Sequence, residues 1–205
     1  MRRVAIVLLS IAMACTSGKA FAVDKDKRFV VQPASSYPGR QTSEKITIAA
    51  VPYNTKELAE IAFGKVKPYE YGILPVLVVI QNDTGKALRL DLTAKYVATD
   101  GETVEAMTPD DVVRFQGIQK RPGIAKPNPL PIPLPRSNKK GPLNTPEIEG
   151  RAWAVRLIPA GESAHGFVYF QARNVRGAQL YLTGIRDAAS GQQYFYFEIP
   201  LDGKR

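Results

Sequence analysis

The sequence predicts a mainly β protein, an antiparallel β-sandwich with one or two short helices and a long proline-rich loop. Roughly eight or nine short apolar or alternating segments follow one another, separated by turn residues, as in a sandwich. Most connections between them are too short for the crossover helices that parallel strands need. In addition, eight of the 16 prolines lie within residues 121–146, where they interrupt the strand pattern.

The composition limits the chemistry. The chain has 205 residues, of which 44% are hydrophobic, which suits one domain with a single core. One Cys excludes a disulfide framework within the chain, and one Cys with one His argues against a zinc site of the usual ligands. We therefore expect no metal and no cofactor.

Residues 1–22 have the features of a secretory signal peptide. A basic start precedes an apolar run over 4–14, and an Ala-Phe-Ala tripeptide ends at Ala22. The apolar run is shorter than the about 20 residues that a spanning helix needs. We expect cleavage after Ala22, export to the periplasm or cell envelope, and no transmembrane helix in the mature chain.

Cys15 leaves a second outcome open. The tetrapeptide Ala-Met-Ala-Cys that ends at Cys15 resembles the lipobox of bacterial lipoproteins, in which the chain is cleaved before a cysteine that becomes lipidated. The lipoprotein family usually has Leu where this chain has Ala12, and Ala or Ser where it has Met13. Cleavage after Ala22 would give a soluble chain without cysteine, and lipidation of Cys15 an anchored one.

The first half of the domain, placed at 44–199 after a polar lead-in over 23–43, contains most of the clear strand patterns. Residues 29–31 are a candidate edge strand within the lead-in. Alternating apolar residues predict half-buried strands, and a continuous β-branched run predicts a central strand covered on both faces. The predicted strands are 44–51, 75–80 (the central one), 88–96 and 103–107.

Two helices are expected between these strands. Asn54 and Glu57 resemble a capping box, and Gly64 ends the segment as a C-terminal glycine would. Thr108 precedes Pro-Asp-Asp, which predicts a second helix to about residue 115, ending at Gly117. The two aspartates, 110 and 111, do not share a helix face, so we interpret them as charges that favour a helix start.

The second half returns to strands, and a turn separates each from the next. We expect them at 153–158, 164–171, 178–183 and 193–199, with a loop at 187–191 and a tail over 200–205. Trp153 is expected in the core.

Two motifs resemble exported bacterial immunoglobulin-like proteins. The segment Leu-Pro-Val-Leu-Val-Val-Ile-Gln-Asn over 74–82 is an apolar strand that ends in Asn, and Pro-Ala-Gly-Glu over 159–162 precedes the aromatic strand Phe-Val-Tyr-Phe over 167–170. The resemblance covers about residues 44–199 and implies an immunoglobulin-like topology. It implies no catalytic residues.

The proline-rich segment 121–146 is the most distinctive part of the sequence. Proline occupies every second position from 127 to 135, which excludes a helix or a sheet interior and favours polyproline II. A segment of this kind is either a solvated spacer or a recognition element with apolar side chains between basic ones. The candidate partner-binding residues are Lys120, Arg121, Lys126, Leu130, Ile132, Leu134, Arg136, Lys139 and Lys140.

The net positive charge of the mature chain comes from this segment and the residues just before it. The formal net charge of +9 falls to +6 without residues 1–22, and residues 112–146 alone carry +7 with no acid. Outside the cytoplasm, such a segment would meet another envelope protein or an anionic envelope surface. Since no nucleic-acid motif is present, we expect no nucleic acid as partner.

Catalytic patterns are absent from the sequence. Ser163 and His165 would share one face of a strand, but no Gly-x-Ser-x-Gly elbow accompanies them, and no phosphate loop or calcium loop occurs. The aromatic run 194–197 offers a binding surface instead: Tyr194 and Tyr196 would face one way as a candidate platform, unless both faces are covered.

Together these patterns predict a non-enzymatic exported cell-envelope protein that acts as a protein-interaction scaffold or accessory subunit. The alternative is a periplasmic or surface module that binds glycan or lipid through exposed aromatic residues.

Overall fold

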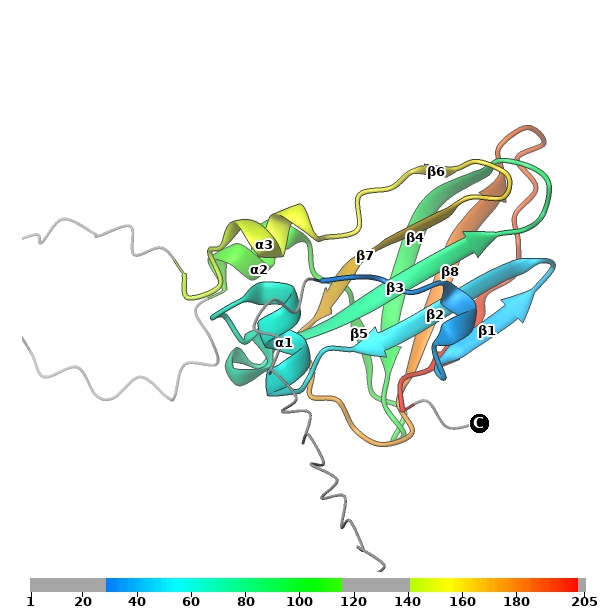
Figure 1. The fold of residues 1–205 in the computed structure, drawn as a ribbon. Coiled ribbons are helices and arrows are strands. Elements are labelled where there is room, and N and C mark those ends of the chain that lie inside the picture. Colours follow the sequence, from blue (N-terminus) through cyan, green and yellow to red (C-terminus); the bar gives the residue numbers. More distant parts are fainter. Residues whose placement is uncertain (1–28, 116–140, 203–205) are drawn as a thin grey trace, which may run out of the picture.

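The computed structural model describes residues 29–115 and 141–202, which form two antiparallel sheets with helices at one end (Figure 1). The mainly β prediction, with two packed antiparallel sheets, is confirmed. The predicted signal peptide with Cys15 and Ala22, and the candidate binding residues from Lys120 to Lys140, lie outside the described residues.

The first sheet has the order β1-β2-β3-β7 and every pair is antiparallel. Its central strand β3 is the predicted β-branched run, and Pro75 stands near its start, paired with Tyr169. The strands are β1 (Arg40–Ser43), β2 (Ile46–Pro52), β3 (Leu74–Asn82) and β7 (Ser163–Phe170).

The second sheet has the order β5-β4-β8-β9, and a two-residue strand β6 also pairs with β4. The alternation predicted for 88–96 is confirmed, because apolar residues of β4 point into the sandwich while Arg89 and Asp91 are exposed. The strands are β4 (Leu88–Val97), β5 (Thr103–Glu105), β6 (Leu157–Ile158), β8 (Gln179–Asp187) and β9 (Phe197–Pro200).

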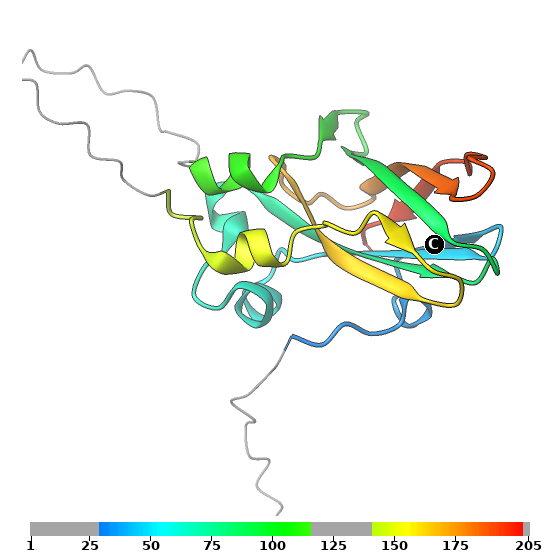
Figure 2. The same ribbon diagram turned by 90° about the horizontal axis from the view of Figure 1, so that it is seen from above.

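The two inner strands of the first sheet, β2 and β3, are buried on both faces over most of their length. One face packs against the second sheet through side chains such as Ile48, Val78 and Leu182. The other carries a second core, which includes Leu77 and Phe167 and is covered by helices. These helices gather at one end of the molecule (Figures 1 and 2), and they are α1 (Lys56–Phe63), α2 (Pro109–Arg114) and α3 (Pro146–Gly150). Two 3₁₀ turns lie at Ala34–Ser36 and Pro68–Tyr71.

A connecting segment joins the sheets at one edge. The backbone N–H of Trp153 donates to the Phe167 carbonyl of β7 at 2.8 Å, and the Arg156 carbonyl accepts from Leu90 of β4 at 2.9 Å. At the opposite edge, the Glu198 N–H donates to the Gln41 side chain at 2.6 Å. The sandwich is thus tied together at both edges.

Several predicted boundaries were wrong. The N-cap of α1 is Thr55, whose hydroxyl accepts from the Leu58 N–H at 3.4 Å, and Asn54 precedes it. The strand predicted at 153–158 is reduced to Leu157–Ile158, because residues 153–156 run from one sheet to the other. The last strand begins at Phe197 and not at 193, because Gln193 forms only an isolated bridge with Arg186 and the ladder with β8 becomes continuous at Phe197.

Two further differences concern the ends of predicted loops. Residues 29–31 form no strand, and Phe29 packs instead on the second core. The last residues of the predicted proline-rich loop belong to the fold: Leu143 is fully buried and Pro146 begins α3. Gly117, the expected end of α2, lies outside the described residues.

None of the helices among the described residues has the length and apolar character needed to cross a membrane.

Candidate functional site

In the second sheet, β8 has a register shift toward β4 on one side and an exposed aromatic surface on the other. Leu90 pairs with Ile185 and Thr93 with Thr183, so the register between β4 and β8 shifts between these pairs. Gly184 lies at the shift with φ of +90°, and a methyl group there would collide with the Asp91 carbonyl. Only glycine fits this conformation and this space, so the sequence itself fixes the bulge.

The segment before β9 runs alongside β8 in the same register as β9. The Tyr194 N–H donates to the Ile185 carbonyl at 2.9 Å, and the next pair in the ladder joins Leu182 to Phe197. Between these pairs, Phe195 and Tyr196 are 76% and 51% exposed.

Tyr181 on β8 completes the surface. Its ring stacks on that of Tyr196, with centroids 5.2 Å apart and planes inclined by 25°. In the register of the sheet, Lys95 and Glu198 flank Tyr181 on the neighbouring strands. We call Tyr181, Phe195 and Tyr196 the aromatic surface, and it combines flat apolar rings with hydroxyl and charged groups at its edge.

The loop that leads to this surface is held firmly by one buried carboxylate. Asp187 accepts hydrogen bonds from the Ala189 and Ser190 N–H groups at 2.8 and 3.0 Å, and from the Lys86 ammonium at 2.9 Å. The Lys86 ammonium first, and then the two amides, hold the pKa of Asp187 well below its usual value. Because this loop is already ordered, binding at the aromatic residues that follow it should cost little conformational entropy.

Only one of the two tyrosines of the candidate platform is exposed. Tyr196 is exposed, whereas Tyr194 is half-buried and packs against the sandwich core. Phe195 and Tyr181 were not among the candidates, because strict alternation places Phe195 on the face of the buried Phe197. Gly184 in the middle of an alternating strand was the signal for a bulge.

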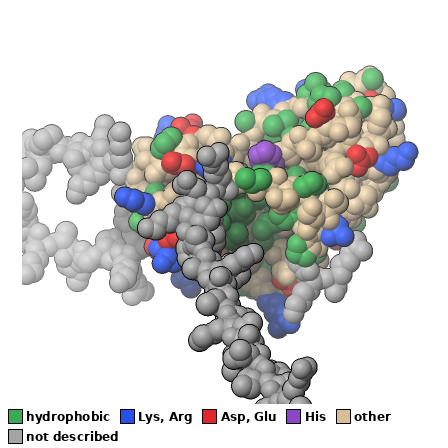
Figure 3. All heavy atoms as spheres, viewed as in Figure 1, with side chains coloured by type: hydrophobic (Ala, Val, Ile, Leu, Met, Phe, Trp, Pro, Cys, Tyr) green, Lys and Arg blue, Asp and Glu red, His purple; other side chains and the backbone are tan. Residues whose placement is uncertain are grey.

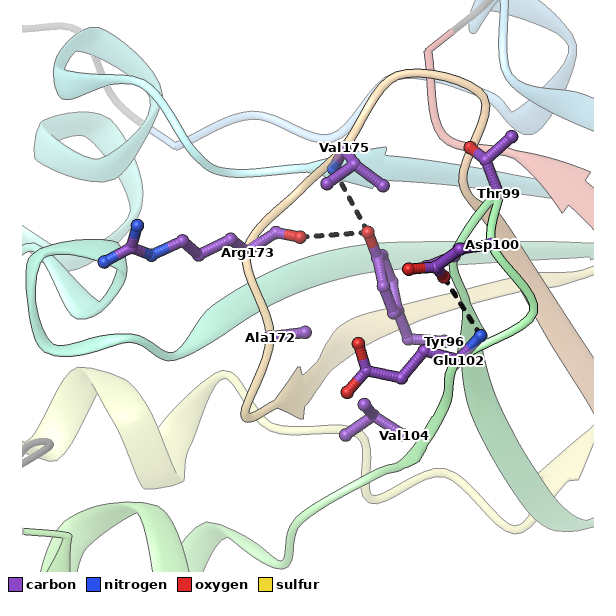
Figure 4. Close-up of a pocket in the computed structure, with 9 residues that line it drawn as sticks. Tyr96, Thr99, Asp100, Glu102, Val104, Ala172, Arg173 and Val175 are labelled. Carbon is purple, nitrogen blue, oxygen red and sulfur yellow. Dashed lines mark hydrogen bonds between the residues drawn. The ribbon is translucent and has the colours of Figure 1, made fainter.

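A hollow of about 480 Å³ lies elsewhere, between the turn that joins β4 to β5 and the loop that joins β7 to β8 (Figure 4). The buried Tyr96 anchors it: its hydroxyl donates to the Arg173 carbonyl at 2.9 Å and accepts from the Val175 N–H at 3.1 Å. Apolar residues, namely Ala98, Val104, Ala172 and Val175, form much of the lining.

Two carboxylates, those of Asp100 and Glu102, also line this hollow. Asp100 accepts a hydrogen bond from the Glu102 N–H at 3.1 Å, which shapes the tight turn. Burial raises the pKa of Tyr96, and the negative charges of Asp100 and Glu102 add to this effect. The side chain of Arg173 points away from the hollow, toward the helices (Figure 4).

The two ends of the undescribed segment 116–140 meet at one place. A methyl group at Gly141 would lie 2.6 Å from the Val113 carbonyl oxygen and 3.2 Å from that of Phe115. Leu143, next to this point, is fully buried in the second core. Phe115 and Gly141, the described residues on either side of this segment, therefore lie next to each other beside the second core.

The groups that were considered for catalysis are not assembled into a site. Ser163 and His165 are exposed on β7, opposite Gln81 and Val79, and no hydrogen bond joins them. Within 29–115 and 141–202, no group of three or more potential ligand residues is placed to hold a metal. On the face in Figure 3, outside the grey atoms, acidic and basic side chains are scattered without a large field of one sign.

Comparisons with known proteins give little. No protein-family model and no curated protein matches the chain. A solved structure described as the X-ray structure of Northeast Structural Genomics Consortium target SoR45 is similar over 80% of this chain and 92% of its own, with a TM-score of 0.34 and 9% identity. A likeness at this level carries no argument about fold or function.

Proposed function

We propose that this protein is a non-enzymatic, exported cell-envelope protein that acts as a protein-interaction scaffold or accessory subunit. Its recognition element is the proline-rich basic segment. The observation that supports this proposal is the base of that segment, where Val113 and Phe115 meet Gly141. The described residues on either side of the segment thus lie side by side on a packed core, as the two ends of a surface loop do.

The composition of the segment suits recognition. Residues 116–140 contain six Lys and Arg and no acid, and proline alternates with Leu130, Ile132 and Leu134. Proline-rich chains lose little conformational entropy on binding, while apolar and basic side chains supply contacts and an attraction to anionic rims. The expected partner is another envelope protein with an acidic, partly apolar groove.

Export and an immunoglobulin-like topology are parts of the same proposal. The basic start, apolar run and Ala-Phe-Ala site at 1–22 support secretion, with cleavage after Ala22 or lipidation at Cys15. The mass of the mature protein distinguishes the two processing routes. We also propose an immunoglobulin-like topology, which is supported by the two-sheet sandwich and by the motifs at 74–82 and 159–162.

The test is in-cell cross-linking and pull-down with the mature chain and two variants. In one variant, a short Gly-Ser linker replaces residues 116–140; in the other, Leu130, Ile132 and Leu134 become Ser and all charges remain. We expect a discrete protein partner with the mature chain and its loss with both variants. Capture of the same partner by the linker variant would overturn the proposal.

The aromatic surface favours a second candidate function, binding of glycan or lipid headgroups. Tyr181 of β8 stacks on Tyr196, whose neighbour in sequence is Phe195. Exposed rings with polar neighbours suit the apolar faces and hydroxyls of sugars. Retention on envelope-glycan resin should fall with Tyr196→Ala and Phe195→Ala. Leu157→Ala, a change at a 53% exposed apolar residue elsewhere, is the matched control.

A further inference from the structure

The hollow beside Tyr96 has the chemistry of a site for a basic side chain with an apolar stem. Four of its nine lining residues are apolar, and the Tyr96 hydroxyl already donates one hydrogen bond and accepts another within the protein. The negatively charged side chains that line the hollow are those of Asp100 and Glu102. A long basic side chain buries its methylene stem on such walls while its charged head reaches a carboxylate.

Neither of these two carboxylates is held in an ion pair of the described fold. Five ion pairs join described side chains, and neither Asp100 nor Glu102 takes part in one. Arg173, which follows Ala172 of the apolar lining, directs its guanidinium away from them (Figure 4). None of the five ion pairs therefore compensates the negative charge of these two carboxylates.

Positive charge is concentrated in the segment that follows Phe115. The described residues carry 14 Lys and Arg against 17 Asp and Glu, a net charge of −3, whereas segment 116–140 carries +6. Basic pairs stand at both ends of the segment, at Lys120-Arg121 and Lys139-Lys140, and apolar residues stand between them. The segment thus carries both kinds of group that the hollow accepts.

We propose that the hollow lined by Asp100, Glu102 and Val175 binds the chain's own proline-rich basic segment through Lys or Arg side chains. Chain length allows this contact. Val104 of the hollow is 11 residues from Phe115, at which the segment begins, so the two are at most roughly 27 Å apart. Half of this 25-residue segment would reach roughly 37–40 Å at the rise per residue of a polyproline II chain.

The tether decides between the chain's own segment and that of another copy. A segment linked to the hollow has an effective concentration on the order of millimolar, far above that of separate molecules at micromolar concentration. This inference rests on the proposed function for its consequence: a partner that captures the segment must displace it from the hollow. Partner capture and docking are measured separately, so either one can fail alone.

The experiment uses residues 23–205, which contain the whole described fold and no cysteine, with Ser137→Cys carrying a nitroxide spin label. Amide NMR spectra of the isotope-labelled protein are compared before and after reduction of the label. We expect the nitroxide to broaden the amides of residues 98–104 and 172–175. A mixture of nitroxide-carrying protein without isotopes and isotope-labelled protein without the nitroxide should show no broadening.

The matched variants change charge and little else. Asp100→Asn with Glu102→Gln should abolish the broadening, and the amide that replaces the first carboxylate still offers an oxygen to the residue 102 N–H. Glu44→Gln with Glu162→Gln removes two charges in exposed turns at the other end of the sandwich, where the Lys45 and Glu162 carbonyls bond the end of β3, and should preserve it. Unbroadened amides in the parent protein, equal broadening in both variants, or broadening in the mixture as strong as in the parent protein would overturn the proposal.

Discussion

At the scale of single residues, Gly184 has the clearest structural consequence. Its positive φ and the close Asp91 carbonyl stand at the register shift between β4 and β8. We predict that Gly184→Ala destabilises the protein by about 2–4 kcal/mol, because a methyl group adds a steric clash to backbone strain. Urea unfolding followed by circular dichroism measures this change.

Gly85 provides the control for that prediction. It also has a positive φ, +78°, but no atom lies within 4 Å of the position of an added methyl group. Gly85→Ala should therefore cost only the conformational strain, about 1–2 kcal/mol. Equal losses for the two variants would show that the bulge is not held by the contact with Asp91.

Asp187 gives a pH-dependent prediction. Because its pKa is depressed by Lys86 and by the Ser190 and Ala189 amides, its contribution to stability is present above its ordinary pKa of 3.8 and is lost as the pH falls below that value. Asp187→Asn should be less stable near neutral pH, and its deficit should shrink between about pH 4 and pH 2. Urea unfolding at several pH values measures both proteins.

The neighbouring exposed Asp83 serves as the comparison. Asp83→Asn removes a carboxylate whose side-chain contacts are two 3.2 Å hydrogen bonds from Gln81. Its deficit at neutral pH should be much smaller than that of Asp187→Asn. A deficit of Asp187→Asn that stays constant down to acidic pH would contradict the role of this carboxylate as a charged loop anchor.

At the scale of elements, the contact between β7 and α3 holds the base of the proline-rich segment. The buried Tyr169 hydroxyl donates to the Ile148 carbonyl of α3 at 2.7 Å. Tyr169→Phe leaves this carbonyl without that donor and should cost about 1–3 kcal/mol. Hydrogen exchange should also become faster in α3, since the helix loses its link to the sheet.

Tyr71→Phe is the natural control, since Tyr71 is half-buried against the same second core. No hydrogen bond of its hydroxyl joins it to a described residue, so its removal should change the free energy of unfolding by less than about 0.5 kcal/mol. Faster exchange throughout the protein, and not in α3 first, would indicate general loosening.

The elements also show what the sequence was able to predict. The period-two pattern of β4 and the β-branched run of β3 were sufficient, because each element's burial follows from its own residues. By contrast, the backbone at Trp153 pairs with β7 through Phe167, far along the chain, and α3 is only five residues long. Such elements depend on tertiary contacts, which a local pattern does not contain.

The candidate sites follow the same division. The aromatic run left open whether Tyr196 would be exposed, and the half-burial of Tyr194 depends on its packing against the sandwich core, which strand alternation alone does not give. The hollow between residues 98–104 and 172–175 joins two loops that are about 70 residues apart in the sequence. No spacing rule links them, and only the pairing of β4 with β8 brings them together.

At the scale of the whole molecule, an acidic fold carries a basic segment that starts and ends at one place. If the fold is complete without that segment, its length affects stability only through loop-closure entropy. Replacing residues 116–140 by about four Gly and Ser residues shortens the loop by between two and three doublings. The free energy of unfolding should then stay equal or rise by up to about 1.6 kcal/mol.

Denaturant unfolding of the linker variant and the parent measures this difference, and the slope with urea should be nearly unchanged because the exposed area on unfolding is similar. Replacing Leu143 by Ala in the parent is the contrasting change, because this fully buried residue belongs to the second core and should cost about 2–5 kcal/mol. A large loss on removing 116–140, comparable to that of Leu143→Ala, would mean that the segment packs as part of the core. An unchanged stability would leave the segment free to serve recognition, since a partner could then bind or move it without unfolding the sandwich.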